Sequence, residues 1–366
     1  LPVAHVLARL VMHLVLSGSG VLGFSPNIKN LLPDIQAFKP SVLLVVPRVL
    51  EKVYNAASAK AGGGIKGKMF AWSAKQARTY ALAQERTFGL SLLKKARHGI
   101  ADALVLKKIR SILGPNLRYI VSGGAPLATD LAQFYAGMGI TLLQGYGLSE
   151  TTGPIAVQHV GKNPVGTVGL PLPGNFIKIA KDGEILVKGL SVMPGYYHLP
   201  EQTHQVMPDG EWFHTGDLGS ISKSGQLSIT GRKKELIVTA GGKNVSPEVL
   251  EDSLATHPLI ANVIVVGDQR PFIGALFTLD AEMLPDWLRK HGLPRCSPLE
   301  AAQLPEVQAS LQRAVDRANK AVSRAESIRK FRIIDASFTV ENGYVTPSMK
   351  LRRGKVLHDF ADEVDE

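Results

Sequence analysis

Ser149 and Glu150 are the first residues whose types and spacing could carry chemistry. They lie in the segment Gln144-Gly145-Tyr146-Gly147-Leu148-Ser149-Glu150-Thr151-Thr152. A hydroxyl can donate to a phosphate oxygen, and a neighbouring carboxylate can hold Mg²⁺, a hard cation that shares its other positions with phosphate and water. We therefore predict phosphate contact by Ser149 and a metal ligand at Glu150. The alternative is a helix start, with a capping hydroxyl from Thr151 or Thr152 and an acidic first turn.

Two glycine-rich stretches are candidates for holding a flat ring. One is Gly123-Gly124-Ala125-Pro126, and the other is Tyr146-Gly147. Glycines allow the backbone to approach a ring closely, and a tyrosine offers a stacking face. These residues predict an adenine slot. A tight turn at the glycine pair and a core position for Tyr146 are the alternative.

Asp217 and Arg232 form a second candidate pair. Asp217 stands between glycines in Trp212-Phe213-His214-Thr215-Gly216-Asp217-Leu218-Gly219. A carboxylate in this setting can accept both ribose hydroxyls, as an acidic residue does in other nucleotide folds. Arg232 can hold ribose or phosphate with its rigid donor fork. The alternative for Asp217 is a simple turn aspartate beside glycine.

Lys350 follows Gly343-Tyr344-Val345-Thr346-Pro347, a sequence typical of a loop. A lysine on a mobile loop can move onto a phosphate and neutralise developing charge. Taken alone, Lys350 could equally be one of many exposed lysines.

The bulk composition is that of a globular protein with two or three domains. The chain has 366 residues and a mass of 39.4 kDa. Of its residues, 45% are hydrophobic and 20% are charged. The single cysteine, Cys296, cannot form an internal disulfide and lies in a predicted loop. The net charge of +11 suits polyanions such as nucleotides and coenzyme A, but no nucleic-acid-binding module accompanies it.

The first 24 residues are apolar, but Arg9 and His13 interrupt the run, which excludes a clean membrane span of about 20 residues. We also predict no signal peptide.

Hydrophobic patterning predicts a parallel α/β sheet in the first part of the chain. The run at 41–47 reads as a buried strand, followed by a helix over 48–59, a break at 61–64, and a helical stretch over 68–113 with a break near Gly89. A βαβ unit follows, with strands at 117–122 and 140–143 and a helix over 127–137. The two glycine-rich turns then fall at the carboxyl ends of neighbouring strands, where open α/β sheets bind ligands.

Short strands and frequent turns from 166 to 230 predict an antiparallel, barrel-like subdomain. A small α+β domain then begins. It has a helix over 245–254 with Ser246 as N-cap, strands at 261–267 and 274–279, a long helical stretch over 304–329, and a last strand at 331–338.

Four motifs, in the order 144–152, 214–217, 231–244 and 346–350, resemble those of the adenylate-forming enzymes, and most closely the long-chain fatty acyl-CoA synthetases. The resemblance covers residues 1 to about 357. Leu1-Pro2-Val3-Ala4-His5 is similar to a family segment near the acyl pocket, Ser122-Gly123-Gly124-Ala125-Pro126-Leu127 to the adenine loop, and Tyr146-Gly147-Leu148-Ser149-Glu150-Thr151 to the central phosphate and Mg²⁺ motif. Ser149 stands where the family more often has threonine.

The resemblance assigns further roles to the second half of the chain. It implies that Asp217 and Arg232 bind ribose, that Lys234 is the hinge, and that Gly241-Gly242-Lys243 moves in for thioester formation. Lys350, in Thr346-Pro347-Ser348-Met349-Lys350, matches the lysine of the first half-reaction. The implied domains are residues 1–231, the carboxy-terminal portion of a large AMP-binding domain, and residues 232–366, a small mobile domain.

The family's Ser/Thr/Gly-rich phosphate loop has no match here, so we expect the carboxy-terminal part of a longer enzyme. The implied reaction joins a fatty acid to the AMP portion of ATP, with Mg²⁺, and then to coenzyme A. A carrier-protein acceptor, or a fragment that binds adenine nucleotide without turnover, are the alternatives. We expect a cytoplasmic location. The basic charge and the lipid-like substrate are compatible with peripheral membrane contact. The sequence does not indicate an oligomeric state.

Overall fold

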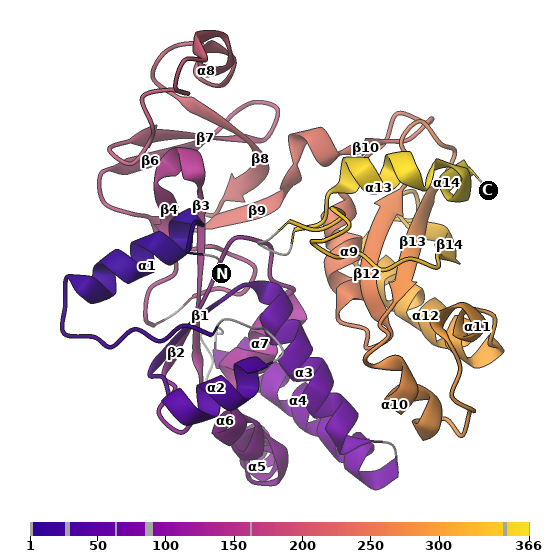
Figure 1. Cartoon of the computed structure of the whole chain (residues 1–366). Helices are drawn as coiled ribbons and strands as arrows, with labels where there is room; N and C mark the ends of the chain where they lie inside the picture. Colours follow the sequence, from indigo (N-terminus) through magenta and orange to yellow (C-terminus); the bar gives the residue numbers. More distant parts are fainter. Residues whose placement is uncertain are drawn as a thin grey trace. The chain divides into compact units, whose positions relative to one another are not determined.

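The computed structural model describes residues 3–25, 30–62, 64–84, 91–161, 163–346 and 350–365. It divides into two compact units (Figure 1). Unit 1 comprises Leu1–Leu50, Gly63–Thr215 and Gly219–Ile229, and unit 2 comprises Glu51–Gly62, Gly216–Leu218 and Thr230–Glu366. The predicted features at Leu1-Pro2, at Gly89 and at Pro347-Ser348-Met349 lie outside the described residues.

Unit 1 contains a mixed five-stranded sheet in the order β1-β2-β3-β4-β5. Its strands are β1 (Val42–Val45), β2 (Tyr119–Ser122), β3 (Thr141–Leu148), β4 (Gly153–Val157) and β5 (Leu170–Pro171). β1, β2 and β3 run parallel, whereas β3, β4 and β5 pair antiparallel. The predicted α/β class, the three parallel strands and the βαβ unit are confirmed.

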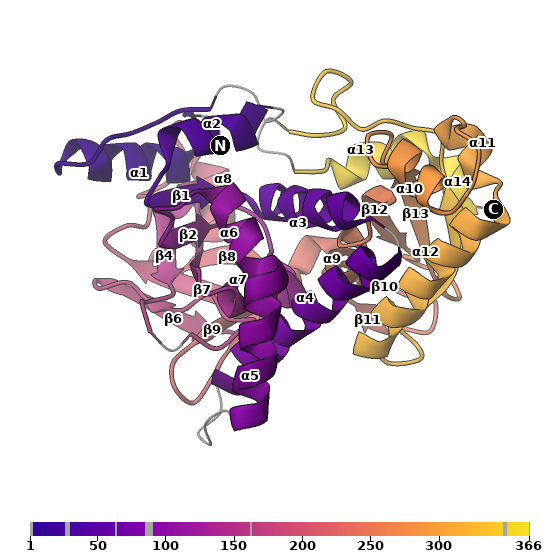
Figure 2. The same cartoon turned by 90° about the horizontal axis from the view of Figure 1, so that it is seen from below.

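The helices in the first part of the chain are α1 (Val6–Leu16), α2 (Leu31–Phe38), α3 (Pro47–Ala61), α4 (Gly64–Gln84), α5 (Leu92–Ala101), the π-helical turn η2 (Asp102–Leu106), α6 (Lys107–Leu113) and α7 (Thr129–Gly137). From Glu51 onward, α3 belongs to unit 2. α4 and α7 lie side by side (Figures 1 and 2), and they touch closely because Gly137 has no side chain: a Cβ there would lie 2.0 Å from the carbonyl oxygen of Ala77. One face of α7, which carries Leu131, Phe134 and Tyr135, is buried.

The antiparallel sheet predicted for 166–230 is confirmed. Its order is β6-β7-β8-β9, with bounds Asn175–Ile179, Glu184–Gly189, Phe213–Ile221 and Leu227–Arg232, and α8 (Pro200–Val206) lies between β7 and β8 in the chain. Ile185, Val187, Phe213 and Leu227 from this sheet form one buried cluster with Ile155 of β4.

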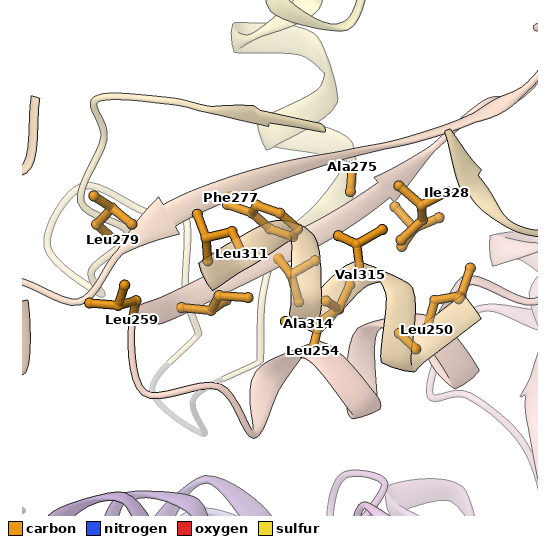
Figure 3. Packing of buried hydrophobic residues seen from close by; sticks show 14 of the residues in the cluster. Leu250, Leu254, Leu259, Ala275, Phe277, Leu279, Leu311, Ala314, Val315 and Ile328 are labelled. Atoms are coloured by element: carbon orange, nitrogen blue, oxygen red, sulfur yellow. The ribbon is translucent and has the colours of Figure 1, made fainter. Parts of the chain in front are cut away.

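Unit 2 is built on a three-stranded sheet in the order β12-β13-β14. Figure 3 shows its core: Leu250 and Leu254 of α9 and Leu311, Ala314 and Val315 of α12 gather against Ala275, Phe277 and Leu279 of β13. Burying each large apolar side chain stabilises the unit by about 1.5–3 kcal/mol. The elements of unit 2 are η4 (Lys233–Glu235), β10 (Ile237–Val238), β11 (Asn244–Val245), α9 (Pro247–Ala255), β12 (Ile260–Val266), β13 (Ile273–Leu279), α10 (Leu284–Lys290), α11 (Pro298–Ala302), α12 (Pro305–Ala318), η5 (Asn319–Ala321), β14 (Ile328–Ile333), α13 (Arg353–Asp359) and α14 (Ala361–Asp365).

Two predicted bounds in unit 2 are wrong. The helix expected to reach residue 329 ends at Ala318 and η5, and the last strand is Ile328–Ile333 rather than 331–338. The side chain of Asn319 explains both shifts, because its amide donates to the carbonyl of Ile328 (3.0 Å) and its oxygen accepts from the amide of Ile328 (2.9 Å). These two bonds tie the helix end to the strand start.

Candidate functional site

His5 lies against the Gly123–Gly124 loop, which follows directly after β2. The ring of His5 caps α1 by accepting from the amide of Leu7 at its Nδ1 (3.2 Å). A Cβ at Gly124 would lie 3.8 Å from Cε1 and Nε2 of the same ring, and Gly124 itself has a φ of +84°. The fold therefore brings the predicted acyl-pocket residue and the predicted adenine loop together, although they are far apart in sequence. Ala125 and Pro126 continue this loop.

The Tyr146-Gly147 motif lies inside strand β3, not in a turn as predicted. β3 runs past the end of β2, whose Ser122 pairs with Gln144, and its last four residues pair with β4. Gly147 is needed for this pairing, because a Cβ there would lie 1.9 Å from the carbonyl oxygen of Gly153. Tyr146 is partly buried against the cluster around Ile155. Chain packing thus accounts for the glycine and, in part, for the tyrosine.

Ser149 and Glu150 begin the 3₁₀ turn η3 (Ser149–Thr151) at the end of β3. Thr151 is fully buried and holds the turn, since its hydroxyl accepts from the amide of Leu148 (2.8 Å) and donates to the carbonyl of Gly153 (2.7 Å). The capping alternative therefore applies to Thr151. Ser149 is exposed and Glu150 half-buried, so both side chains stand at the surface beside the turn.

Tyr196 is the partner of Glu150 that sequence reasoning missed. Its hydroxyl donates to Oε1 of Glu150 at 2.9 Å, and the amide of Met193 donates to the Glu150 carbonyl at 2.8 Å. Burial raises the pKa of Tyr196, and the bond to Glu150 and the charge of Glu150 raise it further. Tyr196 stands beside Tyr197, and nothing in the sequence separates the two.

Asp217 and Arg232, both in unit 2, are brought together. Nε of Arg232 lies 3.0 Å from Oδ1 of Asp217, whose side chain is only 5% exposed, while that of Arg232 is 49% exposed. Asp217 lies in strand β8 and Arg232 at the end of β9. A buried carboxylate that is paired with a half-exposed guanidinium can accept hydrogen bonds from hydroxyl groups while the guanidinium still balances its negative charge.

Lys350 belongs to the same unit and lies within electrostatic reach of this pair. Although the residue is exposed, desolvation by surrounding protein lowers the pKa of Lys350, and the positive charge of Arg232 lowers it further. Asp217 and Glu235 act in the opposite direction. The fold therefore brings Asp217 and Arg232 into contact, and the charges of both act on the pKa of Lys350.

Glu248 and Glu251, on the first turns of α9, are further ionisable groups that the sequence analysis did not single out. Burial raises the pKa of Glu248 to about 7, and the charges of Glu235, Asp217 and Glu251 add to the effect. A Cβ at Gly231 would lie 3.7 Å from Oε2 of Glu248, which places this carboxyl beside the chain that leads into Arg232. In the sequence, the signal for these two groups was the three-residue spacing of Glu248 and Glu251 on a predicted helix, which places their side chains next to each other.

The Gly241-Gly242-Lys243 loop joins β10 and β11 in a hairpin. Thr239 closes it, since its hydroxyl accepts from the amide of Lys243 (3.2 Å) and donates to the carbonyl of Lys243 (3.3 Å). Nζ of Lys243 lies 3.4 Å from Glu326. Lys234 is exposed in the 3₁₀ turn η4, between β9 and this hairpin.

Ser246 occupies the predicted N-cap position of α9, but it makes no capping bond. Its hydroxyl donates instead to the carbonyl of Thr230 at 2.9 Å. The side chain therefore ties the start of α9 to the end of β9 and cannot also accept from the helix amides.

Family comparison agrees with this arrangement. Residues 1–197 match the AMP-binding enzyme family, and residues 234–366 match the AMP-binding enzyme C-terminal domain. The chain belongs to the AMP-binding enzyme family. Among the residues that the structure describes, no group of three or more His, Cys, Asp or Glu side chains could hold a metal ion. No described helix is both long and apolar enough to span a bilayer.

Relatives and solved structures extend the comparison. The chain is 48% identical over 366 residues to the long-chain-fatty-acid–CoA ligase FadD15 of Mycobacterium tuberculosis. The aligned residues cover 100% of this chain and 61% of the relative. It is 30% identical over 382 residues to the long-chain-fatty-acid–CoA ligase 1 of Cavia porcellus, covering 100% of this chain and 53% of the relative. The chain thus spans about three-fifths or less of these relatives.

The solved adenylation domain of a carboxylate reductase from Mycobacterium chelonae is similar in fold. Its TM-score is 0.68 at 22% identity, with 93% of this chain and 48% of that chain covered. A second structure is the A domain of the carboxylic acid reductase from Segniliparus rugosus in complex with AMP and a co-purified carboxylic acid. Its TM-score is 0.66 at 22% identity, with 93% of this chain and 49% of that chain covered.

Proposed function

We propose that this chain is part of a long-chain fatty acid–CoA ligase that activates the acid with ATP and then forms the coenzyme A thioester. The observation that carries the proposal is 48% identity over all 366 residues to FadD15. Two facts of the structure support it. Arg232 pairs with Asp217 in unit 2, where the charges of both act on Lys350, and the ring of His5 lies against the Gly124 loop in unit 1.

In the first half-reaction the fatty carboxylate attacks the α-phosphorus of ATP, and pyrophosphate leaves. We assign to Lys350 the neutralisation of charge that develops on the phosphate oxygens. Ser149 donates to a phosphate oxygen. Asp217 accepts the ribose hydroxyls, with Arg232 holding its carboxylate in place. The loop Gly123-Gly124-Ala125-Pro126 and Tyr146-Gly147 would border the adenine, and His5 the acyl group.

Mg²⁺ fits the carboxylate of Glu150, an oxygen donor of the type this cation prefers. When bound, the ion would supply positive charge to the phosphates. Tyr196 donates to one oxygen of Glu150, which fixes the orientation of the carboxylate. One protein carboxylate is consistent with Mg²⁺, because this ion keeps several waters and takes other oxygens from the nucleotide phosphates.

In the second half-reaction the thiol of coenzyme A attacks the acyl carbonyl, and AMP leaves. We assign the exposed Gly241-Gly242-Lys243 hairpin to this step. Residues 232–366 would then act as a small domain that moves about Lys234, within the turn η4. A hinge needs few residues, and such positions are typically loop or element ends.

Pyrophosphate release by this chain, with Mg-ATP and an acid of palmitate length, tests the proposal. We expect release that Lys350→Ala abolishes and that Lys320→Ala, at an exposed turn, leaves unchanged. AMP binding should be retained in Lys350→Ala and lost in Asp217→Ala. Absence of release together with intact, Asp217-dependent AMP binding would leave a nucleotide binder without turnover. Absence of AMP binding in the folded chain would contradict the nucleotide site itself.

The surface of α5 supports peripheral contact with an anionic membrane as part of the same proposal. Leu92, Leu93 and Ile100 are 84%, 61% and 54% exposed, and Lys94, Lys95 and Arg97 lie among them. Apolar and basic side chains on one surface helix favour an acidic bilayer interface. Co-sedimentation with vesicles containing phosphatidylglycerol should fall when the three basic residues are replaced by glutamate. The cytoplasmic location stays a prediction.

A further inference from the structure

Arg353, at the start of α13, is anchored by two other elements of unit 2. Its guanidinium pairs through Nη2 with Oε1 of Glu251 on α9, and through Nη1 it donates to the carbonyl of Val265 on β12 (2.8 Å). The same oxygen of Glu251 accepts from the amide of Val265 (2.7 Å). These contacts close a small ring of charge-assisted hydrogen bonds among α9, β12 and α13, which we call the Arg353 clamp.

The Arg353 clamp is suited to hold the start of α13 in a fixed position relative to α9 and β12. The side chains of Arg353 and Glu251 are 17% and 21% exposed, so water competes little for their contacts. A planar guanidinium with several donors holds its partners in a fixed geometry, which an ammonium does not. Nε of Arg353 also lies 4.0 Å from Oε2 of Glu235, in the turn that carries Lys234.

Lys350 stands three residues before this clamp, and its backbone pairs with that of Thr346. Its amide donates to Oγ1 of Thr346 (3.0 Å), and its carbonyl accepts from the amide of Thr346 (2.8 Å). Val345 pairs with Leu351, and the amide of Arg352 donates to the carbonyl of Tyr344 (2.8 Å). Three extended residues span at most about 10 Å, so the clamp limits where the Cα of Lys350 can be.

We propose that Arg353 and Glu251 are positioning residues that fix the backbone carrying Lys350 for the adenylation half-reaction. This inference rests on the function proposed above. Neither residue touches the reacting atoms; they act through the backbone between Lys350 and Arg353. Misplacing a catalytic group by about 1 Å can cost about 100-fold in rate. Since the assigned role of Lys350 ends with adenylation, loss of the clamp should affect that step alone.

The first test separates the two half-reactions in Arg353→Met, Arg353→Lys and Glu251→Gln. We expect pyrophosphate release to fall by about 10- to 100-fold in Arg353→Met, and less in the two conservative variants. Thioester formation from supplied acyl-adenylate and coenzyme A should change by less than about 3-fold, because Lys350 is not needed there. Arg352→Met removes an exposed neighbouring arginine and serves as the matched control, with both steps unchanged.

A second readout does not depend on turnover. The lysines are methylated reductively with ¹³C, and the Lys350 signal is assigned by its absence in Lys350→Arg. Its pKa lies below the ordinary value because of desolvation and Arg232. We expect this pKa to rise in both Arg353→Met and Glu251→Gln, as the amine becomes free to leave its place.

The two variants distinguish positioning from direct charge effects, because they remove charges of opposite sign. Through simple Coulomb interaction, loss of Arg353 would raise the pKa of Lys350 and loss of Glu251 would lower it. A rise in both supports the clamp; opposite shifts or no shift would overturn it. Equal loss of both half-reactions would also overturn it and indicate a merely structural role. If the unmodified chain releases no pyrophosphate, turnover by this chain is excluded, while the Lys350 signal still decides the clamp.

Discussion

Two glycines of strand β3, Gly145 and Gly147, meet very different surroundings. A Cβ at Gly147 would lie 1.9 Å from the carbonyl oxygen of Gly153 and 2.6 Å from the Cα of Pro154. A Cβ at Gly145 would find its nearest neighbour at 3.5 Å, an ordinary contact. At the first position the obstacle is backbone, which cannot rotate away as a side chain can.

Gly147→Ala should therefore destabilise the protein, and Gly145→Ala should not. We expect a loss of about 2–3 kcal/mol in the free energy of unfolding for Gly147→Ala, the upper part of the usual range for overpacking. Gly145→Ala should change it by less than about 1 kcal/mol. Urea unfolding followed by fluorescence measures both. Equal effects would contradict the close approach of β3 and β4 at Gly147.

Tyr196 gives a second prediction, this time about function. Tyr196→Phe removes the hydroxyl that orients Glu150 and little else. Losing a hydrogen bond to a metal-holding carboxylate costs about 10- to 100-fold in metal affinity. We expect the Mg²⁺ concentration that half-saturates pyrophosphate release to rise by this factor. Tyr197→Phe, at a tyrosine 87% exposed, is the control. An unchanged Mg²⁺ dependence would separate Glu150 from the metal role assigned to it.

Among the elements, the β10–β11 hairpin depends on one side chain. Thr239→Val keeps the shape of residue 239 but removes the hydroxyl that bonds both backbone groups of Lys243. We expect thioester formation to fall by roughly 3- to 10-fold, since loop order contributes to positioning, and adenylation to change by less than about 2-fold. Thr256→Val, where the hydroxyl bonds Ser253 at the end of α9, is the control. Loss of adenylation instead would refute the assignment of this hairpin to the second step.

The elements also show what the sequence can and cannot reveal. Apolar runs and glycine breaks predicted β1, β2, α3 and the βαβ unit, because burial on a sheet or helix face imposes a period that can be read directly. The extension of β3 through Tyr146-Gly147 could not be predicted, since it depends on the partner strand β4. The end of α12 depends likewise on Asn319, whose side chain reaches a strand that begins nine residues later.

The same limit applies to the candidate site. Asp217, Arg232 and Lys350 stand out by motif; the structure brings the first two into contact, and their charges act on the pKa of Lys350. Tyr196, Glu248 and the Arg353 clamp do not stand out, because a hydrogen bond between distant residues leaves no local pattern. Sequence motifs therefore predicted the residues to which we assign roles in the reaction. The residues that contact and orient them could be found only from the three-dimensional structure.

At the scale of the whole molecule, two buried groups make stability depend on pH with opposite signs. Burial lowers the pKa of His257 from 6.5 to about 4, and the charges of Arg317 and Arg313 add to this. Between these values the folded chain binds fewer protons than the unfolded chain, so the free energy of unfolding rises with pH and is lost as pH falls from 6.5 towards 4. Glu248, with its pKa raised from 4.5 to about 7, does the reverse.

For Glu248 the folded chain binds more protons than the unfolded chain between pH 4.5 and about 7. Its contribution to stability is therefore full below pH 4.5 and is lost as pH rises through about 7, by on the order of 2–3 kcal/mol. Glu248→Gln, which resembles the protonated carboxyl, should be as stable as the unmodified chain near pH 5 and more stable near pH 8. Urea unfolding at several pH values measures the difference, and Glu306→Gln on the exposed face of α12 is the control. The difference between the two chains isolates Glu248, because His257 is common to both. A difference that does not change with pH would show that Glu248 is ionised throughout, and that the carboxyl beside Gly231 is better solvated than its burial indicates.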